Sequence, residues 1–432
     1  MTEQLPAGRQ MQNFIYRAGL YGRRPRVPVN IKDLQNAAVR KMSTQARGYI
    51  DGSAGSEATA AANRAAFDQW QLVPRVATPV PVRSTSVELF GEPLPSPFLL
   101  APIGVAEMVH PRADRATAEA ARHTRTPMTV STQASVPMEK IAYELHGAPW
   151  YYQLYWGTSD EVAFSMVRRA EAAGASAIVV TLDTFMLGWR TRDLDNGFLP
   201  FAHGMGIGQY TSDPEFAKLV EARVQAAPEA ETKDSPRPTP AALRALISMS
   251  KRYPGPLWKN LRSPYPRAAV ETFLEVFSRT DLEWKDLARL RGVTDLPIVL
   301  KGIQHPDDAQ HAQQLGFDAL WVSNHGGRQL DGAASSLDSL VQVRKAVGAE
   351  MPLIFDSGVR TASDAVKALA LGASAVGIGR PYLYGLALEG ASGVASVLDY
   401  FNAELDISLG LMGVTNVADL HDHHLRPSGR ST

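Results

Sequence analysis

Two neighbouring segments indicate the architecture of this chain: Leu296-Pro297-Ile298-Val299-Leu300-Lys301 and Ala319-Leu320-Trp321-Val322-Ser323-Asn324-His325-Gly326-Gly327-Arg328. Each begins with a short apolar run, typical of a buried strand, and ends in polar residues. In an α/β barrel, parallel strands present such residues together at one catalytic rim. The glycine pair permits a tight turn, so His325 and Arg328 can project into one space as a base and a carboxylate ligand. The alternative interpretation is a surface His and Arg in a glycine turn.

The same pattern, an apolar run followed by a helical stretch, recurs along the chain. Most units are roughly 25–30 residues long, as expected for a strand plus a crossover helix. We therefore predict an eight-stranded parallel (β/α)8 barrel, a TIM barrel, over residues 97–390. Its strands are expected at Phe98–Ile103, Met128–Ser131, Tyr151–Tyr155, Ala177–Leu182, Pro297–Lys301, Ala319–Ser323, Leu353–Asp356 and Ala375–Gly379.

One unit is much longer than the others. Residues 184–296, here called the insertion, separate the fourth strand from the fifth, and its central part spans 195–290. Because the fourth strand ends at the catalytic rim, the insertion leaves from the active-site face, and we predict that it is a lid. A disordered surface loop is the alternative. A separate domain is a weaker interpretation, because apolar residues look too sparse for a core and helical patterns are limited to Ala241–Met249 and Val270–Phe277.

The remaining segments flank the barrel within a single domain of 432 residues. Residues 1–96 are expected to form a helical arm and residues 391–432 a C-terminal helix and tail. Within the arm, residues 1–12 are polar and predicted to be loose, Asn13 to Val29 is a basic, Pro-containing stretch, and helices are predicted at Ile31–Tyr49 and Glu57–Trp70.

Composition excludes several classes of function. Basic and acidic residues are balanced at 44 each, so nucleic acid and anionic membrane are poor candidate partners. No apolar run reaches the roughly 18 residues of a membrane span, and an N-terminal signal core is lacking, so a cytoplasmic location is expected. The absence of cysteine excludes disulfides and thiolate chemistry. No metal site is predicted, since His421-Asp422-His423-His424 is interpreted as a solvated tail.

Chemically useful side chains gather at the predicted strand ends. His325 with Asp183 is a base with an orienting carboxylate. Lys301 could stabilise an electron-rich, reduced cofactor. Carboxylate and hydroxyl ligands for a substrate are expected from Arg190, Arg328, Tyr49 and Tyr155. A phosphate site is expected after the last two strands, at Gly358, Arg360, Gly379 and Arg380, and the edge of a flat polar ring at Ser131, Gln153 and Thr181.

These motifs resemble the FMN-dependent 2-hydroxy-acid oxidase and dehydrogenase family. The resemblance runs from about Tyr49 to beyond Arg380, and its most specific segment is Ser323-Asn324-His325-Gly326-Gly327-Arg328-Gln329. Within the family, the branch of lactate 2-monooxygenases is most similar, through Ala101-Pro102-Ile103-Gly104-Val105, Leu182-Asp183-Thr184 and the long insertion. Two positions depart from the common pattern: Gln133 stands where many relatives have an aromatic residue, and Gly104 where others often have Ala. Gly104 is expected to leave room near the flavin.

The resemblance implies FMN as the cofactor. It places the phosphate at Gly358, Arg360, Gly379 and Arg380, the ribityl chain at Asp356 with Ser357 next to it, and the ring against Pro102, Ile103, Gly104, Ser131, Gln153, Thr181 and Ser323, with Lys301 facing the reduced ring. His325 would remove a proton from the substrate with support from Asp183. Arg190, Arg328 and Tyr49 would hold the carboxylate and Tyr155 the hydroxyl side.

The expected reaction is oxidation of L-lactate or a close 2-hydroxy acid, with O2 as the second substrate. A lid that retains the products would give acetate, CO2 and water. A simple oxidase, or a dehydrogenase with another electron acceptor, is the alternative. A flavin-free lyase or isomerase barrel and a non-catalytic binding barrel are different classes that the residues leave open. The resemblance also implies a homo-oligomer, either a tetramer or an octamer.

Overall fold

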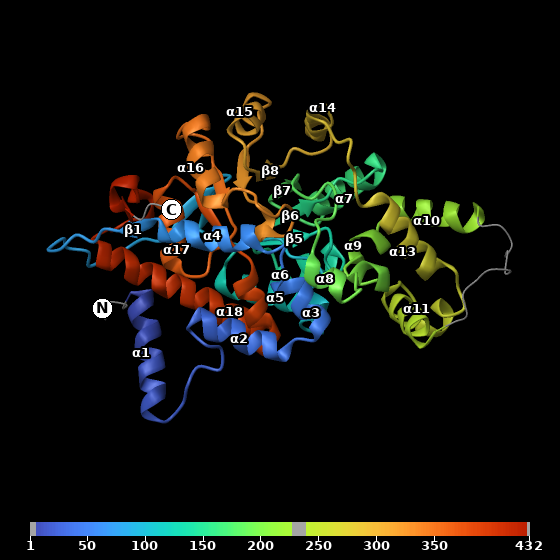
Figure 1. The fold of residues 1–432 in the computed structure, drawn as a ribbon, viewed down its shortest axis with the longest axis horizontal. Coiled ribbons are helices and arrows are strands. Elements are labelled where there is room, and N and C mark those ends of the chain that lie inside the picture. The colour runs from blue at the N-terminus through green and yellow to red at the C-terminus, as the bar shows by residue number, and fades with distance from the viewer. Residues whose placement is uncertain (1–5, 227–238, 430–432) are drawn as a thin grey trace.

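A closed barrel of eight parallel strands lies at the centre of the protein (Figure 1). The computed structural model describes residues 6–226 and 239–429. The strands follow one another around the barrel in the order β10-β11-β4-β5-β6-β7-β8-β9. The predicted (β/α)8 barrel is confirmed, and the strands are β4 Phe98–Leu100, β5 Met128–Ser131, β6 Trp150–Leu154, β7 Ala177–Thr181, β8 Ile298–Ile303, β9 Ala319–Val322, β10 Leu353–Phe355 and β11 Ala375–Ile378.

Alternation of side chains along the strands fills the barrel. Leu99, Val179 and Trp321 belong to an inner cluster, whereas their sequence neighbours pack outward in the larger cluster that includes helix residues. A hairpin of β2 (Val87–Leu89) and β3 (Glu92–Leu94) contributes to the inner cluster and plugs the end of the barrel opposite the polar rim. The rim at the carboxyl ends is thus the end available for a site.

Helices cover the outside of the barrel. Their starts carry the expected capping residues: the Ser335 hydroxyl accepts the Asp338 N–H, and Thr361 and Asp364 form a reciprocal capping box. The last helix kinks at Gly390, where φ is 61°. None of the helices in the described residues is long and apolar enough to cross a membrane. The covering helices are α5 Ala113–Thr124, α6 Met138–Leu145, α7 Asp160–Ala172, α15 Pro306–Gln314, α16 Ser336–Val347, α17 Ala362–Ala370 and α18 Arg380–Met412.

The N-terminal arm differs from the prediction at two places. Residues 7–12 of the segment expected to be loose, and part of the basic stretch after them, form α1 (Ala7–Leu20), because Gly8 packs closely on α18 and donates its N–H to Asp406 Oδ2 at 3.0 Å. Residues 1–5 of that segment lie outside the described residues. The single helix expected over Ile31–Tyr49 is two helices, α2 (Ile31–Lys41) and α3 (Thr44–Asp51), since Ser43 caps the second one. The next helix of the arm is confirmed as α4 (Ala58–Asp68).

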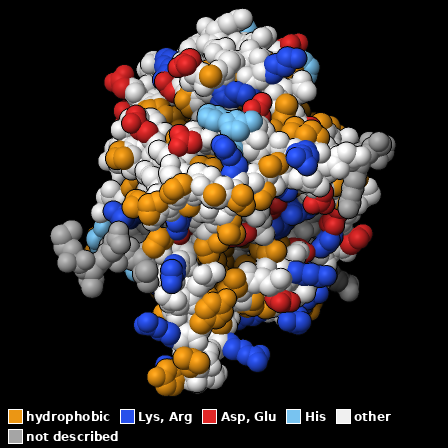
Figure 2. All heavy atoms as spheres, turned by 90° about the vertical axis from the view of Figure 1, so that its left-hand side faces the viewer, with side chains coloured by type: hydrophobic (Ala, Val, Ile, Leu, Met, Phe, Trp, Pro, Cys, Tyr) orange, Lys and Arg blue, Asp and Glu red, His pale blue; other side chains and the backbone are white. Residues whose placement is uncertain are grey.

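Helix α1 projects from the body of the molecule (Figure 1). Four large side chains in this helix, or directly after it, are strongly exposed: Phe14, Tyr16, Leu20 and Tyr21. Figure 2 shows hydrophobic and basic side chains together at this protruding lower end.

The insertion is largely helical and packs on the barrel. As expected, it has no separate core among the described residues: its buried side chains, large aromatic ones among them, belong to the same hydrophobic cluster as the barrel. Phe273 is fully buried, and the Tyr210 ring lies 4.9 Å from it and 5.3 Å from Phe216. Residues 227–238 of the predicted insertion lie outside the described residues. Its helices are α8 Thr191–Asp195, η2 Pro200–His203, α9 Gly208–Thr211, α10 Pro214–Ala226, α11 Pro240–Arg252, α12 Leu257–Asn260, α13 Tyr265–Val276 and α14 Trp284–Ala288.

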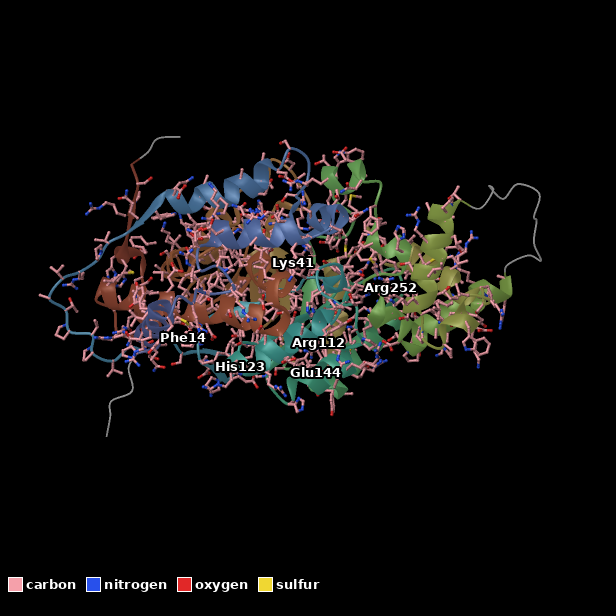
Figure 3. The ribbon with its side chains drawn as sticks, turned by 90° about the horizontal axis from the view of Figure 1, so that it is seen from below. Phe14, Lys41, Arg112, His123, Glu144 and Arg252 are labelled. Atoms are coloured by element: carbon pink, nitrogen blue, oxygen red, sulfur yellow. The ribbon has the colours of Figure 1, made fainter. Side chains whose placement is uncertain are left out.

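The insertion occupies one end of the molecule, beyond the carboxyl ends of β5 to β7 (Figure 1). Arg252, at the end of α11, is labelled in Figure 3, where it lies between the insertion helices and the barrel. The insertion therefore adjoins the rim at which the predicted site residues end.

Candidate active site

The carboxyl ends of the strands surround a cavity whose volume, with the open solvent at its mouth included, is about 1100 Å³. The predicted site residues that line it are Tyr49, Pro102, Ile103, Gly104, Ser131, Tyr155, Arg190, Lys301, His325, Arg328, Asp356, Ser357, Gly358, Arg360, Gly379 and Arg380. The other four have buried side chains, and each pairs with a lining residue: Gln153 and Ser323 through hydrogen bonds, Asp183 through His325, and Thr181 as the strand partner of Lys301. The structure thus brings all twenty predicted residues together.

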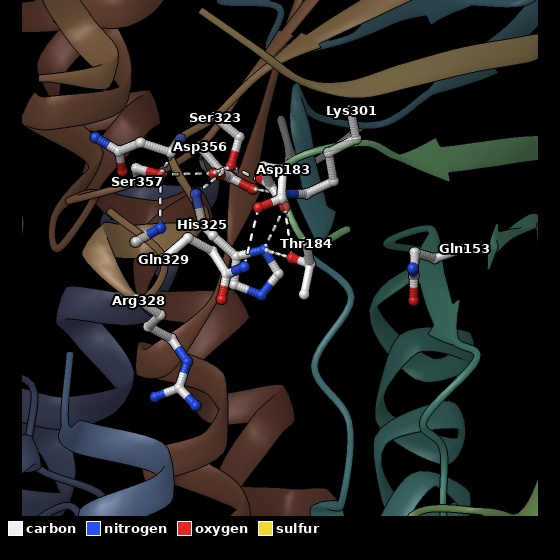
Figure 4. A network of polar contacts seen from close by, with 12 residues as sticks. Gln153, Asp183, Thr184, Lys301, Ser323, His325, Arg328, Gln329, Asp356 and Ser357 are labelled. Carbon is white, nitrogen blue, oxygen red and sulfur yellow. Dashed lines mark hydrogen bonds and ion pairs between the residues drawn. The ribbon is translucent and has the colours of Figure 1, made fainter. Parts of the chain in front are cut away.

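His325 is held by a carboxylate and a hydroxyl (Figure 4). Its Nδ1 lies 2.8 Å from Asp183 Oδ1, and the Thr184 hydroxyl lies 2.8 Å from that oxygen and 3.2 Å from Nδ1. Burial lowers the pKa of His325, so its imidazole is neutral near pH 7. Burial opposes ionisation of Asp183, but its interactions with His325 and Lys301 bring its pKa down to about 2. Nε2 is left as the ring nitrogen that can take a proton from a ligand.

Lys301 supplies a buried positive charge to the cavity wall. Its Nζ donates to Ser323 Oγ at 2.8 Å and lies 3.4 Å from Asp356 Oδ2 and 3.8 Å from Asp183 Oδ2. Ser323 Oγ in turn donates to Asp356 Oδ1 at 2.5 Å. Two carboxylates compensate the cost of burying this ammonium group, and the charge is thereby held in place at the cavity (Figure 4).

Two guanidinium groups face the same cavity. Arg328 Nη1 donates to Gly52 O at 2.8 Å, and its guanidinium carbon lies 5.0 Å from the centre of the Tyr49 ring. Arg190 Nη2 donates to Gln329 Oε1 at 2.9 Å. Neither forms an ion pair with a carboxylate within residues 6–226 and 239–429. Burial and the nearby charge of Arg190 lower the pKa of Arg328, so an anionic ligand would stabilise this pair.

The turns after β10 and β11 form the other end of the cavity. Gly358 has φ 87°, and a Cβ there would lie 2.7 Å from Asn63 O, so this position requires glycine. Arg360 donates to the carbonyl of Val359 next to it, and burial lowers its pKa. Arg380 differs, because its guanidinium already donates to the carbonyls of residues 50, 52 and 326 and to the hydroxyl of residue 53. Arg360 is thus the better placed of the two to pair with a phosphate.

The chemistry of the wall fits a flat, polar-edged cofactor. Nine buried side-chain atoms have no hydrogen-bond partner among the described residues, and those beside the cavity include Gln153 Nε2, Thr181 Oγ1 and Gln133 Oε1. Buried polar atoms are normally paired, so these atoms indicate a missing ligand with donors and acceptors on its edge. Figure 4 shows Gln153 apart from the network around Lys301, with no interaction drawn to it. Together with Lys301 and Arg360, these atoms fit the ring and phosphate of FMN.

Close packing between two loops explains why residue 104 is a glycine. A Cβ at this position would lie 2.5 Å from Gln133 Cβ and 2.9 Å from Gln133 O. The missing side chain therefore allows the loops after β4 and β5 to pack together, and the expectation that it leaves room near the flavin stays a prediction.

Several residues of the site were not predicted. Thr184 contacts both members of the His325–Asp183 pair, and Gln329 bridges Arg190 to the carbonyl oxygen of Asp183, to which its Nε2 donates at 3.0 Å. Thr184 directly follows Asp183, and Gln329 follows Arg328, so adjacency to a predicted residue was the available signal. Leu187, Phe201 and Phe277 of the insertion also line the cavity, and nothing in the sequence around them indicates that they belong to the site.

Comparisons with known proteins agree with this geometry. Residues 38–427 match the model of the family described as FMN-dependent dehydrogenase. The chain is 40% identical to an L-lactate oxidase of Lysinibacillus sphaericus, over 91% of each protein. It is 38% identical to an FMN-dependent alpha-hydroxy acid dehydrogenase of Penicillium citrinum, over 96% of this chain and 95% of that protein.

The fold agrees with a solved structure as well. A crystal structure of mandelate oxidase with (S)-4-hydroxymandelic acid superposes with a TM-score of 0.74, at 31% identity, and covers 92% of this chain and 98% of that one. The family match, over residues 38–427, extends beyond the barrel and includes α3 and α4 of the arm. This chain belongs to the FMN-dependent dehydrogenase family.

Proposed function

We propose that this enzyme oxidises L-lactate, or a close L-2-hydroxy acid, and passes the electrons to O2. One observation carries the proposal: the neutral imidazole of His325, bound to Asp183, shares a cavity with two guanidinium groups that lack carboxylate partners in the described chain. A proton acceptor beside two guanidinium groups that can bind a carboxylate suits a substrate that carries a hydroxyl next to its carboxylate.

Each side chain has a role in this proposal. Arg190, Arg328 and Tyr49 bind the substrate carboxylate, and Tyr155 binds its hydroxyl side. His325 Nε2 takes the hydroxyl proton, and Asp183 stabilises the imidazolium that forms. Burial raises the pKa of both tyrosines, so they remain protonated hydrogen-bond donors.

Another set of residues would hold the cofactor. Gly358, Arg360, Gly379 and Arg380 surround its phosphate, with Asp356 and Ser357 along the ribityl chain. The ring would lie against Pro102, Ile103, Gly104, Ser131, Gln153, Thr181 and Ser323. FMN, when bound, accepts the hydride from C2 of the substrate and returns two electrons to O2. Lys301 contributes a positive charge that favours the electron-rich state.

We further propose that the second half of the reaction is that of a lactate 2-monooxygenase. L-lactate and O2 would give acetate, CO2 and water if the insertion retains the keto acid with the peroxide. Support comes from Leu187, Phe201 and Phe277, which extend the cavity wall from the insertion. The names of relatives favour a second candidate, an oxidase that releases pyruvate and hydrogen peroxide. A cytoplasmic location and a homo-oligomer stay predictions.

The test is anaerobic mixing of the holoenzyme with L-lactate, followed by O2 and product analysis. We expect loss of the flavin absorbance, then acetate and CO2 with little peroxide. Pyruvate and peroxide in equal amounts would support the oxidase and leave the first half-reaction in place. No loss of absorbance with L-lactate or longer L-2-hydroxy acids would refute the substrate assignment.

A further inference from the structure

An ion pair joins the cavity wall to the insertion. Glu107 lies in η1 (Ala106–Met108), directly after the loop that places Pro102 to Gly104 in the wall. Its Oε2 accepts from Arg252 Nε of α11 at 2.6 Å, with side chains that are 18% and 26% exposed. Figure 3 shows Arg252 where the insertion meets the barrel. Because both side chains are largely shielded from solvent, the charge-assisted hydrogen bond between them helps to hold α11 against the barrel.

The same carboxylate holds a second part of the insertion. Glu107 Oε1 accepts the Gly206 N–H at 3.2 Å, and Gly206 packs against Val105 and against Phe201. Arg252 also donates to Ser248 Oγ at 2.7 Å, and that hydroxyl donates to His203 O at 2.7 Å. Glu107 thus fixes the segment 201–206 directly at Gly206 and, through Arg252 and Ser248, at His203.

This segment carries a wall residue of the cavity. Phe201 is 4% exposed, lines the cavity, and its ring lies 6.4 Å from that of Tyr49 and 5.2 Å from that of Phe273. Movement of η2 away from Glu107 would therefore open the wall beside the proposed substrate ligand Tyr49.

The rest of the insertion has other anchors. Arg169 of α7 donates to Asp213 Oδ2 at 3.1 Å and to Gln209 O at 3.1 Å. Gln209, which is fully buried, exchanges hydrogen bonds with the loop at Val136 and Met138. These contacts hold α9 and α10 and do not involve Glu107. Loss of the ion pair between Glu107 and Arg252 would therefore release η2 without undocking the rest of the insertion.

We propose that the Glu107–Arg252 pair is a latch that determines the product, by keeping the keto acid in the cavity after the first half-reaction. The proposal rests on the proposed function. In the closed cavity, an oxygen of hydrogen peroxide bonds to the carbonyl carbon of pyruvate. The bond from that carbon to the carboxylate carbon and the O–O bond both break, giving acetate, CO2 and water. An open latch releases pyruvate and peroxide.

The experiment uses the holoenzyme and variants that remove or exchange the two charges. Glu107→Gln and Arg252→Gln remove the charge pair, and the exchanged pair Glu107→Arg with Arg252→Glu restores it. Arg267→Gln is the matched control, because it removes an ion pair of similar length, Nε to Glu271 Oε1 at 2.7 Å, within α13 of the insertion. Acetate, pyruvate and peroxide are measured per L-lactate consumed, beside the anaerobic rate of flavin reduction.

We expect Glu107→Gln to raise the ratio of pyruvate to acetate roughly tenfold, as for one lost charge-assisted hydrogen bond. Anaerobic reduction should stay within about twofold, the exchanged pair should recover much of the acetate, and the control should match the wild type. An unchanged ratio in both single variants overturns the latch.

A second readout separates failure of the latch from failure of the proposed function. Amide hydrogen exchange across residues 199–206 of the holoenzyme needs no substrate. Faster exchange there in Glu107→Gln than in Arg267→Gln supports the latch contact even if the wild type makes only pyruvate and peroxide. Equal exchange in the two variants refutes it, whatever the substrate is.

Discussion

The protonation state of His325 controls the proposed chemistry, because only the neutral imidazole can accept the substrate proton. Burial lowers its pKa below the ordinary value of 6.5. We therefore expect kcat/KM for L-lactate to be constant near neutral pH and to fall only below about pH 6.5, as His325 becomes protonated. A pH–rate profile from pH 5 to 8 measures this. An acidic limb centred above pH 6.5 would contradict the prediction.

Thr184 positions the catalytic pair without being its proton acceptor. Its hydroxyl contacts Asp183 Oδ1 at 2.8 Å and His325 Nδ1 at 3.2 Å. Thr184→Val removes the hydroxyl and keeps the shape, so we expect kcat to fall about tenfold, the equivalent of one hydrogen bond to a charged group. Thr184→Ser should recover most of kcat because it restores the oxygen. Steady-state kinetics of both variants with L-lactate measure kcat. An equal loss of kcat in the two variants would indicate a packing role for the methyl group.

At the level of residues, strand ends were predictable and their partners were not. His325, Lys301 and Asp356 each end or follow an apolar run, and the barrel then brings them together. Thr184 and Gln329 were missed because their importance depends on the direction of a side chain, such as the Gln329 amide that donates to the Asp183 carbonyl. Local sequence does not encode that direction.

The turn after β10 is the element most suited to holding phosphate. Gly358 brings the backbone close to α4, and Arg360 keeps a guanidinium with no carboxylate ion pair among the described residues. We expect Arg360→Gln to increase the dissociation rate of FMN from the holoenzyme about tenfold or more, because a charge-assisted contact with phosphate is lost. Recovery of flavin fluorescence on dilution measures the rate.

The matched control for that experiment is Arg291→Gln. Arg291 pairs with Asp318 away from the cavity, so its loss should leave FMN release unchanged. An equal increase in both variants would mean that the effect comes from general destabilisation, and no increase for Arg360→Gln would remove this residue from the phosphate site.

Among the elements, those set by local pattern were predicted and those set by distant contacts were not. The eight strands are short apolar runs that any barrel position would bury, and all were found. Helix α1 was missed because its stabilising contact joins Gly8 to Asp406, which lie 398 positions apart. The packing of the insertion was not predicted, because Tyr210, Phe216 and Phe273 come together from three separate helices.

For the whole molecule, the relation between the insertion and the cavity is the main result that sequence could not supply. The length of residues 184–296 and their place after the fourth strand predicted proximity to the site. The contacts that fix the geometry, such as those of Glu107 and Arg169, cross from the barrel to the insertion over tens of residues. The predicted role as a lid stays a prediction, and the proposed latch makes it testable.

The stability of the whole molecule should depend on pH through Asp114, a 2% exposed residue at the start of α5 that accepts the Ser135 N–H at 2.8 Å. Burial raises its pKa to about 7, from 3.8 in the unfolded chain. The folded state therefore keeps a proton that the unfolded state has lost, and stability decreases as pH rises toward 7, by roughly 2 kcal/mol between pH 5 and 7. Asp114→Asn keeps a hydrogen-bond acceptor and cannot ionise. Its Tm should match the wild type at pH 5 and exceed it at pH 8, as measured by circular dichroism, whereas parallel Tm curves would show that Asp114 titrates alike in both states.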